Sequence, residues 1–223
     1  MIISLIGFMG CGKSSVGREL SRLLCCPFMD LDDVIVEAEG RSILEIFATD
    51  GEAAFRRMEL ETLSLIIQSS QKGDLKQSLP SQVTGPSLCG QRGSTVSRHP
   101  SDWITIDCKD RSYPSDVERV LALGGGTVMT PECANLVKEH TFCIYLRASV
   151  DTLLEHLSDE ADGRPMLDSS AESADKQSAL RHRITELMSL RSDIYEKTAH
   201  IIIDTDGKSI ASISQEVIST IVQ

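Results

Sequence analysis

The N-terminal residues constrain the fold of this chain more than any other stretch. A short apolar run, Ile2–Ile6, predicts a buried strand, and Gly-Phe-Met-Gly-Cys-Gly-Lys-Ser follows it at once. This order matches G-x-x-x-x-G-K-[ST], a loop whose backbone N–H groups surround phosphate oxygens. Its glycines permit the backbone angles that turn successive N–H groups into one concavity, and a helix that begins near Lys13 adds its positive end. We therefore expect a phosphate site in which Lys13 reaches the terminal phosphates and Ser14 binds magnesium.

The composition is that of one folded domain. The 223 residues are 41% hydrophobic, which is enough for a real core in a single α/β domain. A net charge of −11 argues against general binding to nucleic acid, and the apolar N-terminal run is too short to span a bilayer and has no basic leader. The seven cysteines include no C-x-x-C pair, so we expect reduced thiols in a cytosolic protein.

Strands alternate with helices along most of the sequence. After the N-terminal strand, apolar runs predict strands at 27–30, 120–123, 142–146 and 200–204. Helical spacing predicts a helix that ends near Pro27, others that begin near Gly51 and at Pro131, one at 150–157, a long one through 187–195 and a C-terminal one. Ser42 and Glu45 form a capping-box pattern at the start of a further helix. This alternation predicts a mainly parallel sheet covered by helices on both faces.

An acidic segment follows the second predicted strand. Asp30, Asp32 and Asp33 come where this strand would end, and ligands of open α/β sheets bind at the carboxyl ends of strands. Asp30 and Asp32 are therefore placed to meet a magnesium complex or a substrate hydroxyl. The alternative is an acidic helix N-terminus, which the helix dipole favours, and Asp33 fits that alternative because a helical pattern continues from Val34.

Two further features are compatible with a ligand site. Arg56 and Arg57 are adjacent in a predicted helix, and their spacing alone does not say which of them is committed to a contact. Three glycines, 124–126, end the strand at 120–123. Glycines in this place allow a ligand to approach the backbone closely, and a flexible turn is the alternative.

Two polar segments interrupt the alternation. Residues 71–100 are rich in Ser, Gln, Gly and Pro, and we interpret about 69–113 as an inserted segment that is disordered or lies on the surface. A strand is expected at 103–106, within this insertion or at its return. The second polar segment, about 158–175, contains Arg164 and has the composition of a mobile lid.

In their order along the chain, these motifs resemble those of the shikimate kinases. They read GFMGCGKSS, FMDLDD, FRRME, LALGGGTV, GRPML and RSDIY, and the resemblance covers nearly the whole chain apart from roughly 68–113. The glycine loop alone is shared by many NTPases, whereas the series FxDxD, FRxxE and GGG is much more specific. The resemblance implies a P-loop fold of the nucleoside-monophosphate-kinase type, with a central parallel sheet, helices on both faces and a mobile lid. It also implies transfer of the ATP γ-phosphate to the 3-hydroxyl of shikimate, a step of aromatic amino acid biosynthesis.

The same resemblance implies roles for individual residues. ATP would be bound by Gly10, Cys11, Gly12, Lys13, Ser14, Ser15, Arg164 and, in the 205–208 turn, Lys208. Ser14 would bind Mg²⁺, with Asp30 near the metal through water. Shikimate would be held by Asp32, Arg56, Gly125 and Arg191. The groups implied to act in catalysis are Lys13, Asp32 and Arg164.

The chemistry of the acceptor agrees with these roles. Shikimate carries a carboxylate and several hydroxyls, so its site needs a planar guanidinium and a hydrogen-bond acceptor. Arg56 and Arg191 fit the first requirement and Asp32 fits the second. Because phosphoryl transfer has a loose transition state, alignment and charge neutralisation matter more than a strong base. We therefore expect Asp32 to orient the hydroxyl first and to accept its proton second.

The sequence departs from the family in three places and leaves two alternatives open. The departures are the insertion, His156 where an arginine precedes the lid, and Met166 where leucine is commoner. The alternatives are another small-molecule kinase of the same architecture, such as a gluconate kinase, and a catalytically silent relative that binds a ligand or partner. We expect ATP and shikimate as ligands, Mg²⁺ as cofactor, no nucleic-acid or membrane partner, and a monomer.

Overall fold

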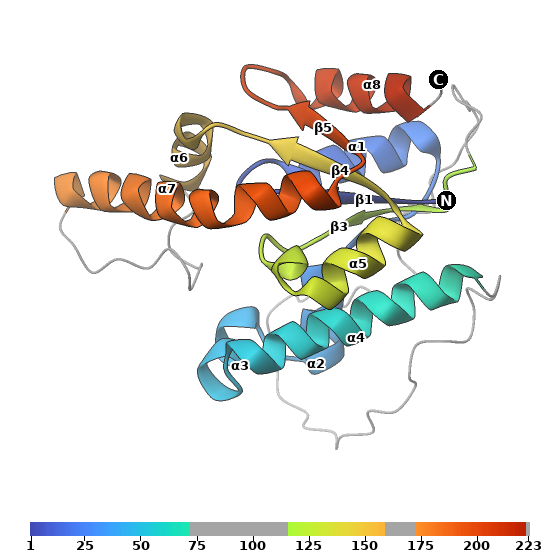
Figure 1. The fold of residues 1–223 in the computed structure, drawn as a ribbon, viewed down its shortest axis with the longest axis horizontal. Helices are drawn as coiled ribbons and strands as arrows, with labels where there is room; N and C mark the ends of the chain where they lie inside the picture. Colours follow the sequence, from blue (N-terminus) through green and yellow to red (C-terminus); the bar gives the residue numbers. More distant parts are fainter. Residues whose placement is uncertain (72–115, 159–172, 222–223) are drawn as a thin grey trace, which may run out of the picture.

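Five parallel strands form the centre of the molecule in a computed structural model that describes residues 1–71, 116–158 and 173–221 (Figure 1). They lie in the order β2-β3-β1-β4-β5, and every neighbouring pair is parallel. The strands are β1 Ile2–Ile6, β2 Phe28–Asp30, β3 Arg119–Ala122, β4 Phe142–Arg147 and β5 Ile201–Asp204. Their ends differ from the predicted ones by one residue at most, so the predicted parallel sheet is confirmed.

Helices connect the strands and cover the sheet. They are α1 Lys13–Leu24, α2 Leu31–Glu39, α3 Ile43–Thr49, α4 Glu52–Gln71, α5 Pro131–His140, α6 Val150–Ser158, α7 Ser173–Thr198 and α8 Ile210–Ile221, with a short 3₁₀ turn, η2, at Thr127–Met129. In Figure 1, α1 and α8 lie on one side of the sheet and α5, with α4 and α2 beyond it, on the other. None of the helices within the described ranges is long and apolar enough to cross a membrane.

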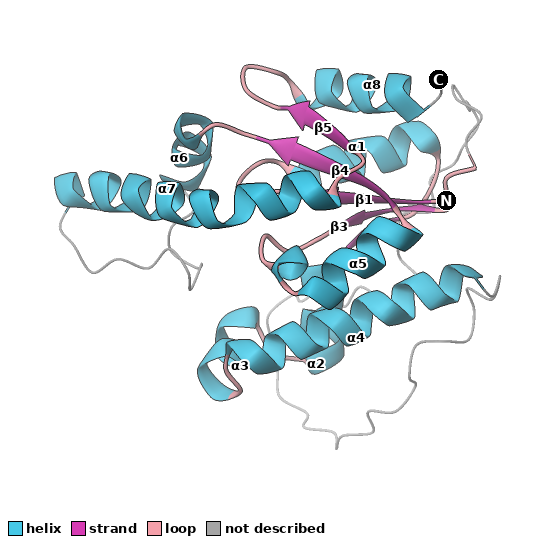
Figure 2. Cartoon of the chain, in the orientation of Figure 1, coloured by secondary structure: helices cyan, strands magenta, loops and turns pink. Residues whose placement is uncertain are grey.

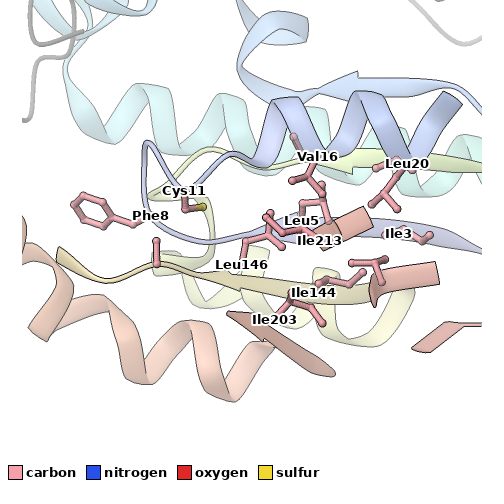
Figure 3. Close-up of a cluster of buried hydrophobic side chains, with 14 of the residues drawn as sticks. Ile3, Leu5, Phe8, Cys11, Val16, Leu20, Ile144, Leu146, Ile203 and Ile213 are labelled. Atoms are coloured by element: carbon pink, nitrogen blue, oxygen red, sulfur yellow. The ribbon is translucent and has the colours of Figure 1, made fainter. Parts of the chain in front are cut away.

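The sheet is buried on both faces, which explains why its strands are almost continuously apolar. All of β1 is buried, and its side chains alternate between two core clusters. Ile3 and Leu5 belong to the α1/α8 cluster, where side chains of those helices meet β1, β4 and β5 (Figure 3). Ile2 and Ile6 belong to the α4/α5 cluster, which also includes residues of α2 and α7. The sheet therefore separates two apolar interiors.

The predicted helix signals are present where the structure can test them. Ser42 Oγ accepts a hydrogen bond from the Glu45 N–H at 3.2 Å, and the Glu45 carboxylate accepts one from the Ser42 N–H at 2.7 Å, which completes the capping box of α3. α1 ends at Leu24, shortly before Pro27, because Cys25 adopts a left-handed backbone with φ of 52°.

Two predicted boundaries move. α4 continues through Gln71, so residues 69–71, which the composition assigns to the insertion, are helical. α7 begins at Ser173, inside the segment predicted as a lid. Residues 72–115 and 159–172, which contain the predicted strand at 103–106 and Arg164, lie outside the described residues. The insertion and the lid therefore stay predictions.

Parallel strands bring the segments that follow them to one edge of the sheet. Figure 2 shows the loops after β1, β3, β4 and β5 at this edge. The glycine loop follows β1, the acidic segment follows β2, and the three glycines follow β3. The topology alone thus gathers the predicted site residues of three separate motifs.

Candidate active site

The loop after β1 adopts the backbone that its glycines predict. Gly7, Gly10 and Gly12 have positive φ of 143°, 81° and 91°, and Gly12 caps the N-terminus of α1. A Cβ atom at Gly7 would lie 2.6 Å from the Leu146 carbonyl oxygen, so this position excludes a side chain by contact as well. Backbone N–H groups and the positive end of α1 meet here, which suits phosphate oxygens.

Lys13 lies against this loop. Its Nζ donates to the carbonyl oxygens of Gly7 and Phe8, both at 2.9 Å. Cys11 is only 3% exposed, and its Sγ is 4.0 Å from Lys13 Nζ, so this residue offers a ligand its backbone and not its thiol. Ser15, in contrast, is exposed. The ammonium group of Lys13 is thus held where the loop would surround a phosphate.

Ser14 and Asp30, the two residues predicted at the metal, are in contact. Ser14 Oγ donates to Asp30 Oδ2 at 2.6 Å. Asp30 also caps α2, because its Oδ1 accepts from the Asp32 N–H at 3.2 Å. A hydroxyl and a carboxylate are the hard oxygen donors that Mg²⁺ uses together with substrate phosphates, so the pair fits magnesium. In the part of the chain that the structure describes, no group of three or more His, Cys, Asp or Glu residues could hold another metal ion.

Asp32 lies in the first turn of α2 among other carboxylates. Its Oδ1 is buried and has no hydrogen-bond partner among the described residues. Burial, reinforced by the charges of Asp30 and Glu59, raises the pKa of Asp32 from 3.8 to about 7, against the opposing charge of Lys13. Asp33 is exposed. Asp32 therefore offers a ligand hydroxyl an acceptor oxygen whose protonation changes near neutral pH.

Arg56 is held between two glutamates of its own helix. Its Nη1 donates to Glu59 Oε2 at 2.6 Å and its Nη2 to Glu52 Oε1 at 3.0 Å. The Arg56 side chain is 18% exposed whereas Arg57 is exposed, which answers the question that their spacing leaves open. Glu59 is fully buried and also accepts a hydrogen bond from Thr127 Oγ1. The guanidinium plane of Arg56 is therefore fixed before any ligand arrives.

The glycines after β3 leave space for charged side chains. A Cβ atom at Gly124 would be 2.8 Å from Asp32 Oδ1, and one at Gly126 would be 2.4 Å from Arg56 Nη2. Both separations are too short for real contacts, so any side chain at either position would displace a residue predicted to bind the substrate. Tight packing of this kind disfavours the flexible-turn alternative.

The carbonyl oxygen of Gly125 faces α7. It accepts hydrogen bonds from Arg191 Nη1 at 3.4 Å and from the Tyr195 hydroxyl. Arg191 is 6% exposed, and its guanidinium carbon lies 5.7 Å from the centroid of the Phe8 ring. Because this carbonyl is engaged by α7, the backbone contact predicted between Gly125 and a substrate would use another group of the turn.

His156 contacts the phosphate loop from α6. Its Nδ1 lies 2.8 Å from the carbonyl oxygen of Gly10, and since a carbonyl can only accept, this nitrogen carries the proton. Leu157 packs against the same glycine, because a Cβ atom at Gly10 would be 2.9 Å from Leu157 Cγ. His156, which stands where the family has an arginine, thus makes a hydrogen bond to the phosphate loop.

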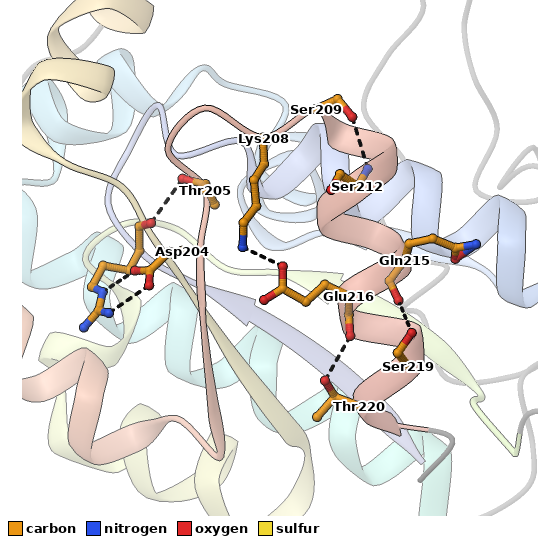
Figure 4. Close-up of polar contacts among 10 residues, drawn as sticks. Asp204, Thr205, Lys208, Ser209, Ser212, Gln215, Glu216, Ser219 and Thr220 are labelled. Carbon is orange, nitrogen blue, oxygen red and sulfur yellow. Dashed lines mark hydrogen bonds and ion pairs between the residues drawn. The ribbon is translucent and has the colours of Figure 1, made fainter.

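Lys208 lies in the turn between β5 and α8. Its Nζ is 2.6 Å from Glu216 Oε2 (Figure 4). The backbone N–H of Lys208 donates to the Thr205 carbonyl oxygen at 3.1 Å, which closes the turn. The side chain is thus engaged by α8, and its predicted role toward a nucleotide stays a prediction, as does that of Arg164, which lies outside the described residues.

Three residues of the site have no role in the sequence prediction: Glu59, Thr127 and Tyr195. Glu59 comes three residues after Arg56, and Tyr195 four residues after Arg191, spacings that place each pair on one face of a helix. That spacing was a usable signal. Thr127 carries none, because its partner Glu59 is 68 residues away.

The fold and this site define a class of protein. A phosphate loop after the central strand of a parallel sheet ordered 2-3-1-4-5, facing carboxylates and buried arginines, is the arrangement of P-loop phosphotransferases of the nucleoside-monophosphate-kinase type. Within that class, the family model described as shikimate kinase matches residues 9–73 and 111–222. The chain belongs to the shikimate kinase family, a family of ATP-using enzymes, and the resemblance of its motifs is confirmed. The internal stretch that the model leaves unmatched, 74–110, lies within the predicted insertion.

Individual relatives agree over nearly the whole chain. The shikimate kinases of Chlorobaculum parvum and Thermus thermophilus are each 32% identical, cover 96% and 97% of this chain, and are themselves covered to 89% and 87%. A structure of shikimate kinase from Aquifex aeolicus superposes with a TM-score of 0.63 at 25% identity, covering 99% of this chain and 96% of that one. Shikimate kinase from Acinetobacter baumannii, solved in complex with shikimate, has the same fold, with a TM-score of 0.70 at 23% identity and coverage of 99% and 92%.

Proposed function

We propose that this chain transfers the γ-phosphoryl group of magnesium-bound ATP to the 3-hydroxyl of shikimate, releasing ADP and shikimate 3-phosphate. The observation that carries the proposal is the position of Asp32. One oxygen of its carboxylate has no hydrogen-bond partner within the described ranges, lies in the electrostatic field of Lys13 and packs on the same glycine turn as Arg56. A group so placed can bind an acceptor hydroxyl next to the γ-phosphate of an ATP molecule held in the phosphate loop.

The nucleotide half of the site consists of the phosphate loop and the residues around it. Backbone N–H groups of residues 10–15 bind the phosphates. Lys13 neutralises negative charge on the terminal phosphates of ATP as ADP leaves. Ser14 would hold Mg²⁺ directly and Asp30 through water, and the bound ion would further neutralise the phosphate charge. As the family resemblance implies, Arg164 would reach the phosphates from the lid, and the turn that contains Lys208 would lie beside the adenine.

The acceptor half is built from α2, α4 and α7. Arg56 and Arg191 bind the shikimate carboxylate, each as a planar guanidinium already held by protein partners. Asp32 accepts the hydrogen bond of the 3-hydroxyl and turns its oxygen toward the γ-phosphorus. Because the transition state is loose, this alignment contributes more than proton abstraction, and Asp32 takes the proton as the new O–P bond forms. All of these groups come from one chain, so we propose that the monomer is the active unit.

The test is release of ADP by the purified protein with magnesium and ATP. We expect release that depends on shikimate, with none above background when gluconate replaces shikimate or when the acceptor is left out. Release with gluconate would favour a different small-molecule kinase of this class. No release with either acceptor, from a protein that binds ATP, would favour the catalytically silent alternative.

Lys13→Ala is the matched control for the chemical step. The lysine stabilises charge in the transition state, so its loss should remove most turnover while the protein stays folded. Near-normal turnover in the folded variant would contradict the role proposed for Lys13.

A further inference from the structure

α7 contacts the glycine turn through two side chains that share one acceptor. Arg191 and Tyr195 are four residues apart, so they lie on the same face of this helix. Both donate to the carbonyl oxygen of Gly125, Arg191 through Nη1 at 3.4 Å and Tyr195 through its hydroxyl. At 3.4 Å the Arg191 contact lies beyond the usual N–H···O range of about 2.7–3.2 Å, so the Tyr195 hydroxyl has the larger part in orienting the carbonyl.

The Tyr195 side chain is itself fixed by its surroundings. It is fully buried, and its ring centroid lies 5.1 Å from that of Tyr145 on β4. A buried hydroxyl that leaves its partner has no water to replace it, so breaking the contact would cost a buried hydrogen bond and leave the carbonyl with only the longer contact from Arg191. The hydrogen bond therefore constrains the turn and the helix together.

The peptide that carries the Gly125 carbonyl also carries the N–H of Gly126. Because a peptide unit is planar, fixing the carbonyl fixes this N–H and the Cα of Gly126. The Arg56 guanidinium lies directly against Gly126, where a Cβ atom would be 2.4 Å from Nη2 and 2.7 Å from Nη1. One peptide thus separates two guanidinium groups, that of Arg191 on its carbonyl and that of Arg56 on the next glycine.

We propose that Tyr195 is a positioning residue for the acceptor, whose hydroxyl fixes the Gly125–Gly126 peptide and thereby the separation of the Arg56 and Arg191 guanidinium groups. This inference rests on the proposed function, in which both arginines bind the shikimate carboxylate. Two guanidinium groups bind one small carboxylate together only when their separation matches it. A rigid spacer between them therefore increases the affinity for shikimate without touching it.

Tyr195→Phe tests the inference because it removes the hydroxyl and keeps the ring. The dissociation constant and KM for shikimate should rise about three- to tenfold, the range for one neutral hydrogen bond. The dissociation constant for magnesium-ATP, measured without shikimate, should stay within about twofold, since less than one neutral hydrogen bond is at stake there. Tyr145→Phe is the matched control. It removes the hydroxyl of the neighbouring ring, which is 1% exposed, and should leave both affinities near those of the parent.

Two further variants test the path through the peptide. Gly126→Ala displaces the Arg56 guanidinium directly and should reproduce the selective loss of shikimate affinity even if Tyr195→Phe were too unstable to purify. Combining Tyr195→Phe with Arg56→Lys should cost less shikimate affinity than the sum of the two single losses, because both act on one separation.

Several results would overturn the inference. They are unchanged shikimate affinity in Tyr195→Phe, equal losses in the two tyrosine variants, a parallel loss of magnesium-ATP affinity, unchanged shikimate affinity in Gly126→Ala, or strictly additive losses in the double variant. Failure of the parent protein to release ADP with shikimate would instead overturn the proposed function, so the two failures are distinguishable.

Discussion

Arg56 keeps its charge in a mostly buried position because Glu52 and Glu59 accept its hydrogen bonds and Gly126 leaves room for its guanidinium group. Removing either glutamate would leave a buried charge with fewer partners, which is costly. The geometry that a ligand carboxylate meets is therefore set by protein contacts made beforehand.

Arg56→Lys keeps the charge and loses the planar fork. Shikimate binding should weaken tenfold or more, about 1.5–3 kcal/mol for a hydrogen bond to a charged group, because an ammonium group cannot bind a carboxylate through two parallel bonds. Titrations with shikimate and with magnesium-ATP, each alone, measure the effect. Nucleotide affinity should hardly change, and an equal loss for both ligands would make Arg56 a structural residue.

His156 gives a second test at this scale. His156→Ala removes the donor to Gly10, and the affinity for magnesium-ATP should fall about two- to fivefold, the lower part of the range for one hydrogen bond because the contact is exposed. His156→Asn places an amide N–H close to the position of Nδ1 and should retain most of the affinity. If the two variants bind nucleotide equally, the hydrogen bond to the loop does not support the nucleotide site.

At the scale of elements, α1 and β2 are packed too closely for a side chain between them. A Cβ atom at Gly17 in α1 would lie 2.3 Å from Cε2 and 2.9 Å from Cδ2 of Phe28 in β2. Both elements carry a site residue, Ser14 and Asp30, whose contact requires this close approach. The glycine in the middle of the helix is thus explained by packing.

Gly17→Ala should destabilise the protein although alanine is the better helix former. The clash with the Phe28 ring should cost about 1–3 kcal/mol, more than the roughly 1 kcal/mol gained in helix propensity. Thermal or urea unfolding measures the change. Phe28→Leu in the same chain should recover part of the loss, because the shorter side chain relieves the clash, and a Gly17→Ala protein more stable than its parent would refute this account.

The order of the elements and the local motifs could be predicted from the sequence because their signals are local. Apolar runs marked each strand of the sheet, and Ser42 with Glu45 marked a helix start. What the sequence could not show is which distant groups pair. Tyr195 donates to a carbonyl 70 residues away, and the choice between Arg56 and Arg57 depends on which side of α4 faces the glycine turn. Such contacts follow from the topology and not from neighbouring residues.

For the molecule as a whole, Asp32 links the site to stability. Its raised pKa means that the folded protein holds the proton more tightly than the unfolded chain does. The stability that protonated Asp32 contributes to the folded protein is therefore fully present below pH 3.8 and is lost as the pH rises to about 7. Above that pH the ligand-free protein carries a half-buried carboxylate that destabilises it.

Asp32→Asn should remove this destabilisation. The stability gained by the variant should grow between about pH 4 and pH 7 and then level off, at no more than about 4 kcal/mol because the group is partly exposed. Unfolding of both proteins over this pH range measures the difference. The variant should lose turnover, and kcat/KM of the parent should rise through about pH 7 as the carboxylate forms. A gain in stability that does not vary with pH would contradict a raised pKa of Asp32.

The division of the interior by the sheet has an evolutionary consequence. Phe8 and Cys11 of the phosphate loop belong to the α1/α8 cluster, whereas Leu31, Phe55 and Tyr195, beside the acceptor groups, belong to the α4/α5 cluster. Substitutions without shared contacts have nearly additive effects, so each cluster can accumulate changes without disturbing the other. Lineages or laboratory libraries that vary only the α4/α5 cluster can therefore acquire new acceptors while the nucleotide-binding site stays intact.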